Sequence, residues 1–94
     1  MSKQINDFEE SLKKYLKDPG FKKIWEDSEA DYQIGKLLIE ARMKQRISQR
    51  ALAKSIGTTQ AVLSRIESNT TSPTFRMAAK IARGLGKRLQ VRFV

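Results

Sequence analysis

Ser48–Asn69, SQRALAKSIGTTQAVLSRIESN, has the pattern of two short helices joined by a tight turn. If the first serine caps the first helix, Leu52, Ala53 and Ile56 share one face of it. Gly57 is suited to end that helix, because glycine accepts the left-handed backbone that most side chains disfavour. Ala53 is small enough to let the next helix cross closely. The stretch therefore predicts a helical corner; the alternative is an ordinary amphipathic helix pair of a small bundle.

The second helix of this corner has an apolar inner face and a polar outer face. Leu63 and Ile66 face inward when Thr58 or Thr59 caps the helix, and Val62 is expected to lean on the core or to touch a thymine methyl group. The outer face then carries amide, hydroxyl and guanidinium groups, which match base edges in a DNA major groove. We expect base readout from Thr59, Gln60, Ala61, Ser64 and Arg65.

Particular bases and phosphates follow from the chemistry of these side chains. Arg65 suits guanine through two hydrogen bonds, Gln60 suits adenine, and Ala61 suits a thymine methyl group. Gln49 would lie at the positive N-terminus of the first helix, where a phosphate is favoured. The further candidates for phosphate contacts are Arg50, Arg46, Lys44 and Asn69. Plain solvation is the alternative for each flanking basic residue.

A family resemblance rests on positions spread from the corner to the end of the chain. Gln49, Leu52, Ala53, Gly57, Leu63, Ile66 and Glu67, with Pro73 and Leu85, resemble the helix-turn-helix of phage-repressor-like (Xre-type) regulators. The resemblance implies an all-α, five-helix repressor-like domain in which Gln49 bonds to a DNA phosphate. It also implies a structural ion pair between Arg42 and Glu67, for which two unrelated surface charges are the alternative.

The composition limits the chemistry of the chain. Its 94 residues suit one compact domain with a short appendage, and roughly 5 to 10 kcal/mol of stability. The chain has no Cys and no His, which disfavours disulfides, thiol or imidazole catalysis and zinc sites. We therefore expect no enzyme, no cofactor and no metal, and no catalytic residue is proposed. Without a membrane-length apolar run or a signal peptide, a cytoplasmic protein is expected.

Charge is distributed unevenly along the chain. Residues 1–31 hold six Lys and eight Asp or Glu, whereas residues 32–94 hold thirteen Lys or Arg and two Glu. The two parts thus carry −2 and +11, which sum to the net +9. A basic C-terminal part that contains the helical corner is typical of a protein that binds a polyanion. RNA is a less suitable ligand than DNA here, because RNA-binding modules more often expose aromatic residues on a sheet.

Three helices are expected ahead of the corner. The first ends at Asp18 and Pro19, which also suit the cap and first position of a second helix, Gly20 to about Asp27. Ser28 and Asp31 form a capping-box pattern that opens a third helix, to about Arg46. Its expected buried stripe is Ile34, Leu37, Leu38 and Ala41. After the corner, Pro73 suits the first turn of a last helix, whose expected stripe is Phe75, Ala78, Ile81, Ala82 and Leu85.

The C-terminal residues 89–94, LQVRFV, alternate in hydrophobicity and predict a short β-strand. A single strand needs a partner, and the simplest is the same strand of a second copy, paired through Leu89, Val91 and Phe93. The alternatives are the sheet edge of another protein, or disorder. We therefore divide the chain into an N-terminal helical extension (1–30), a helix-turn-helix domain (31–88) and a candidate dimer strand (89–94). A homodimer would bind palindromic operator DNA, with recognition helices about 34 Å apart.

The segment YLKDPGFKKIWEDSEADYQIGKLLIEAR resembles the corresponding part of HigA-like antitoxins. The resemblance implies that the chain neutralises a small RelE-like mRNA-cleaving toxin and represses its own operon. An acidic amphipathic helix could dock on the basic surface that such an RNase needs. The candidate toxin-binding residues are Asp7, Phe8, Glu9, Glu10, Leu12, Tyr15 and Leu16. Phe21 and Trp25 are instead expected to pack on the following helices. The second interpretation is a stand-alone Xre-type regulator without a toxin partner.

Overall fold

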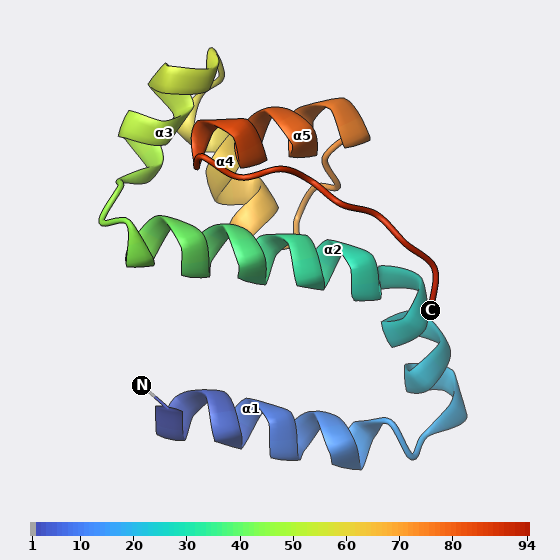
Figure 1. The fold of residues 1–94 in the computed structure, drawn as a ribbon. Coiled ribbons are helices and arrows are strands. Elements are labelled where there is room, and N and C mark those ends of the chain that lie inside the picture. Colours follow the sequence, from blue (N-terminus) through green and yellow to red (C-terminus); the bar gives the residue numbers. More distant parts are fainter. Residues whose placement is uncertain (1) are drawn as a thin grey trace. The chain divides into compact units, whose positions relative to one another are not determined.

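Residues 2–94 are described in the computed structural model, with side chains described from residue 9 onward. The helices are α1 (Ser2–Tyr15), α2 (Pro19–Lys44), α3 (Gln49–Ile56), α4 (Gln60–Glu67) and α5 (Phe75–Gly84) (Figure 1). The all-α prediction is confirmed for the described residues. Five is the number of helices in the whole described chain, rather than in the repressor-like domain alone. By its contacts the chain divides into two compact units, Met1–Ala30 and Asp31–Val94.

Within the first unit, α1 ends at Tyr15, three residues before the predicted stop at Asp18, whereas α2 begins at Pro19 directly after Asp18, as the sequence indicates. The Oδ1 atom of Asp18 accepts a hydrogen bond from the Gly20 amide at 2.9 Å, and Pro19 occupies the first position of α2. The rings of Tyr15 and Phe21 lie on either side of this turn, with centroids 5.3 Å apart. The ring contact therefore packs the end of α1 against the first turn of α2.

One helix, α2, replaces the two that were predicted between residues 20 and 46, so that prediction is wrong. Ser28 does not cap a helix: its Oγ donates back to the carbonyls of Ile24 and Trp25, at 3.1 and 3.3 Å. Asp31 instead accepts a hydrogen bond from Ser72 Oγ at 2.6 Å. The reason is that no proline or glycine interrupts residues 21–34, and a serine in mid-helix can satisfy its hydroxyl on its own helix.

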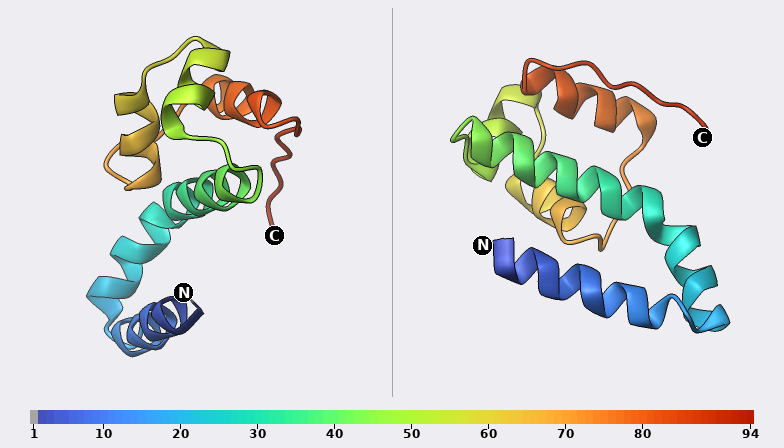
Figure 2. Two further views of the ribbon diagram at one scale, coloured as in Figure 1. Left: turned by 90° about the vertical axis from the view of Figure 1, so that its left-hand side faces the viewer. Right: turned by 60° about the horizontal axis from the view of Figure 1, so that its bottom comes forward.

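The core of the second unit lies where α3, α4 and α5 meet the C-terminal part of α2 (Figure 2). Its buried apolar residues are Leu38, Leu52, Ala53, Ile56, Leu63, Ile66, Ala78, Ile81 and Leu85. Among the predicted stripe residues, Leu37 and Phe75 are 61 % and 75 % exposed, and Ile34, Ala41 and Ala82 are half-buried. Phe75 is the first residue of α5, directly after the capping Thr74, and Met77 packs against the core instead. Pro73 accordingly precedes the cap.

Two glycines shape the second unit. Gly57 has φ +74° and ends α3 in the left-handed region, as the sequence predicts. Gly35 of α2 is buried where α4 ends, and a Cβ atom there would lie 2.8 Å from the carbonyl oxygen of Ile66. Such a contact is closer than a methyl group can tolerate, so α2 and α4 approach closely because residue 35 has no side chain.

No described helix is both long and apolar enough to cross a membrane.

The C-terminal strand predicted over residues 89–94 is not confirmed. This segment carries no strand pairing within the described chain, and Phe93 and Val94 are fully exposed. Leu89 is half-buried and lines a groove of about 560 Å³ together with residues of α2 and α5. The physical reason is that alternation of apolar residues cannot make a strand without a neighbouring backbone to pair with.

Candidate nucleic-acid interface

Two side-chain caps and one glycine build the corner between α3 and α4. The Oγ of Ser48 accepts a hydrogen bond from the Ala51 amide at 3.0 Å, which caps α3. The Oγ1 of Thr59 accepts from the Val62 amide at 3.2 Å, which caps α4. Only residues 57–59 separate the two helices. Local hydrogen bonds therefore fix where α4 starts, and with it which side chains face outward.

The helix α4 has two faces of opposite character. Its inner side chains, Leu63 and Ile66, are 0 % and 1 % exposed. Val62 is half-buried and packs against the core, so of the two expectations for this residue it meets the first. The structure places all five predicted base-reading residues on the exposed surface: Thr59, Gln60, Ala61, Ser64 and Arg65. The outer face thus offers amide, hydroxyl, methyl and guanidinium groups together, which are the groups that read base edges.

Arg42 and Glu67 are brought together behind this face. The Nε and Nη2 atoms of Arg42 donate to Oε2 and Oε1 of Glu67 at 2.8 and 3.1 Å, which is a bidentate ion pair. The side chains are 17 % and 8 % exposed. Arg42 Nη1 also donates to the carbonyl of Ile47 at 3.0 Å. The guanidinium of α2 therefore holds both the end of α4 and the loop before α3.

The pKa of Arg42 is raised above its ordinary value, mainly by the hydrogen bond to Glu67 and against the effect of burial. A base whose pKa is raised on folding keeps its contribution to stability at every pH below its unfolded pKa. For arginine that range extends to strongly alkaline conditions. Arg42 therefore remains charged throughout the range in which proteins are normally handled.

Gln49, a predicted phosphate ligand, is hydrogen-bonded to Gln60, a predicted base-reading residue. Its Nε2 donates to Oε1 of Glu67 at 2.9 Å, and its Oε1 accepts from Nε2 of Gln60 at 3.3 Å. A side-chain amide has two N–H groups, so Gln49 keeps one for a phosphate. A hollow of about 470 Å³ at the start of α3 is lined by Arg42, Ser48, Gln49, Arg50 and Gln60. The lining of this hollow thus includes two predicted phosphate ligands, Gln49 and Arg50, and one predicted base-reading residue, Gln60.

The other predicted phosphate contacts do not line this hollow. Lys44 lines the groove formed by α2, α5 and the C-terminal segment. Asn69 follows α4 with φ +62°. Its Oδ1 atom is directed at Gly35 of α2, where a Cβ atom would lie 2.8 Å from it. Arg46 is exposed in the turn after α2, with φ +56°. The structure therefore groups Gln49 and Arg50 and leaves the other three apart.

A structural contact near the site was missed in the sequence. Gln45 Nε2 donates to the carbonyl of Leu85 at 2.8 Å, which connects the end of α2 to the end of α5. The last carbonyl groups of a helix lack partners within the helix, so the sequence does indicate that some donor must bind at the end of α5. Nothing in the spacing of Gln45 and Leu85 identifies the pair, because the two residues are far apart in sequence.

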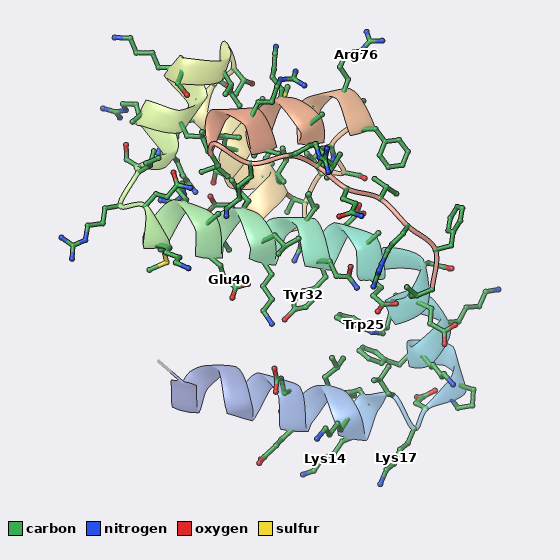
Figure 3. The ribbon with its side chains drawn as sticks, in the orientation of Figure 1. Lys14, Lys17, Trp25, Tyr32, Glu40 and Arg76 are labelled. Carbon is green, nitrogen blue, oxygen red and sulfur yellow. The ribbon has the colours of Figure 1, made fainter. Side chains whose placement is uncertain are left out.

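In the first unit, the predicted toxin-binding residues lie on α1 and just after it. The side chains of Asp7 and Phe8 lie outside those that the structure describes. Glu9, Glu10 and Tyr15 are exposed, whereas Leu12 and Leu16 are half-buried. Lys14 and Lys17 project outward from the same part of the chain (Figure 3). The described part of α1 therefore presents carboxylates, one aromatic ring and basic groups on its surface.

Comparison with known proteins identifies the family of the second unit. Residues 38–91 match the model of a protein family described as helix-turn-helix. This match covers more than half of the chain and includes the whole of α3, α4 and α5. No curated protein and no solved structure matches the chain.

Proposed function

Because the chain belongs to the helix-turn-helix family, we propose that it is an operator-binding repressor that acts as the antitoxin of a type II toxin-antitoxin system. The observation that carries the DNA-binding part is the outer face of α4, where four polar or small residues, together with the capping Thr59, are exposed above a buried apolar face. The helix reads base edges, and Gln49 with Arg50 anchors a phosphate at the start of α3. Two copies bind a palindromic operator.

The electrostatics of binding provide the first test. If each copy of a dimer neutralises about four phosphates, the slope of log affinity against log salt concentration is about −7. We expect this steep slope when affinity for the chain's own promoter is measured by mobility shift across a salt series. A nearly flat affinity between low and moderate salt would remove the DNA-binding proposal.

The antitoxin part rests on the resemblance of residues 15–42 to HigA-like antitoxins and on the surface of α1. Glu9 and Glu10 are exposed on successive positions, close in sequence to the exposed ring of Tyr15. Carboxylates beside an aromatic anchor suit a basic partner surface, such as that of a RelE-like toxin that must bind mRNA. We propose that α1 contacts this toxin.

Co-purification tests the toxin proposal directly. We expect that a small basic protein is encoded beside the chain and that the two form a stable complex when they are co-expressed. Reversing two charges, Glu9→Lys with Glu10→Lys, should weaken the complex at least about tenfold, because like charges would then face each other. The matched control is Lys13→Glu with Lys14→Glu, which reverses two exposed charges on the same helix and should not weaken binding. If the wild-type chain forms no complex, the stand-alone regulator is the better description.

A further inference from the structure

Glu67 is connected to the outer face of α4 by a continuous series of hydrogen bonds. Its carboxylate accepts two hydrogen bonds from Arg42 and one from Nε2 of Gln49, at 2.9 Å. Gln49 in turn accepts from Nε2 of Gln60, at 3.3 Å. Glu67 is 8 % exposed, whereas Gln60 is on the surface. A buried charge and an exposed amide are therefore joined through a single intermediate residue.

The direction of this series follows from chemistry. An ionised carboxylate can only accept hydrogen bonds, so Gln49 must turn its NH₂ group toward Glu67. Its oxygen is then on the other side, toward Gln60, and a carbonyl oxygen can only accept. Gln60 must therefore offer its own NH₂ group to Gln49. The charge on Glu67 fixes the orientation of two amides, each of which would otherwise have two nearly equivalent orientations.

The orientation of Gln60 determines what it presents to a base. With one N–H group directed at Gln49, Gln60 retains its oxygen acceptor and its second N–H group. Adenine presents one acceptor and one donor at its major-groove edge, and a glutamine amide that offers a donor and an acceptor matches both. The reversed amide would place its oxygen against Gln49 and would present its donor and acceptor in the opposite order, which does not match the N7 acceptor and N6 donor of an adenine placed for the first orientation.

We propose that Glu67 is a positioning residue for base recognition: through Gln49 it selects the amide orientation in which Gln60 matches adenine. This inference rests on the proposed function, because it assumes that Gln60 faces DNA. It assigns Glu67 a role beyond the ion pair with Arg42. Glu67 does this without touching DNA.

The test compares two substitutions that both disturb the ion pair. Glu67→Gln replaces an obligatory acceptor by an amide that can also donate, so Gln49 is free to reverse. Arg42→Lys weakens the pair and leaves the carboxylate in place. The operator position read by Gln60 is first identified as the one whose base preference disappears in Gln60→Ala. Affinities for the four bases at that position are then measured for each variant at a temperature where it is folded.

We expect Glu67→Gln to reduce the preference for adenine at that position about tenfold, which is within the range of one bidentate contact. Arg42→Lys should retain the preference, even if it lowers the melting temperature. A purely structural role for Glu67 would lower affinity for all four bases equally in both variants, and that result would overturn the proposal. If Glu67→Gln does not fold, Gln49→Met removes the connection with the ion pair intact and should cause the same loss.

A measurement without DNA separates this inference from the proposed function. In the free protein, NMR should show that the side-chain amide protons of Gln49 exchange slowly with water, and that Glu67→Gln accelerates this exchange. Equal exchange in both proteins would disprove the series of hydrogen bonds. If the series is present but the wild-type protein shows no base preference in any operator, the proposed function fails and the assigned role of Glu67 fails with it.

Discussion

Leu63→Ala should destabilise the protein by about 3 to 5 kcal/mol, which is a large part of the roughly 5 to 10 kcal/mol expected for a chain of this size. Leu63 is 0 % exposed and lies in the core cluster that α3, α4 and α5 form with α2. Truncation removes buried methyl groups and leaves a cavity that the surrounding side chains only partly fill. We expect the urea midpoint, followed by far-UV circular dichroism, to fall sharply, with loss of native structure near 37 °C.

The neighbouring Ser64 provides the control for Leu63. It is exposed on the other face of α4, so Ser64→Ala should change the free energy of unfolding by less than about 0.5 kcal/mol. Similar midpoints for the two variants would mean that α4 does not face the core in the way described.

The double change Gln60→Ala, Arg65→Ala should abolish sequence-specific binding while leaving the fold intact. Each bidentate base contact contributes roughly 1 to 3 kcal/mol of discrimination. Losing both should therefore lower affinity for the operator by about 30-fold to 10⁴-fold, toward the affinity for unrelated DNA. Both side chains are exposed and neither belongs to the core. We expect unchanged urea unfolding together with this loss in a mobility-shift assay on the chain's own promoter.

Arg76→Ala with Gln90→Ala is the matched control for this change, because it removes the same two residue types. Both residues are exposed and lie outside α4, and Arg76 projects from α5 away from α2 (Figure 3). This control should retain the preference for the operator over unrelated DNA. If the α4 variant binds the operator as tightly as the wild-type protein, the reading face has been misplaced.

The features that could be predicted from sequence are those fixed by neighbouring residues. Ser48, Gly57 and Thr59 each act on backbone groups within a few positions, so the corner between α3 and α4 follows from local rules. The same rules failed at Ser28, because a capping residue permits a helix start and does not force one. Nothing in its neighbourhood ends the preceding helix, and its hydroxyl is satisfied within α2.

Other features depend on contacts that local patterns cannot specify. The hydrogen bond from Gln49 to Glu67 joins residues 18 positions apart, the first at the start of α3 and the second at the end of α4. Gly35 is inconspicuous in the sequence, yet its missing side chain sets the closest approach of α2 to the end of α4. The tail alternates like a strand, but alternation describes one chain and pairing requires two.

Because α4 has one buried face and one exposed face, this helix is suited to engineering of the DNA sequence that the protein prefers. Residues 60, 61, 64 and 65 can be randomised as a library without touching the packed residues that hold the helix, since the four are exposed and Leu63 and Ile66 are not. Variants selected for a new DNA sequence should melt close to the parent. Position 60 differs from the other three positions in one respect. Gln60 is oriented through Gln49 by the carboxylate of Glu67, and such a library would leave that carboxylate unchanged.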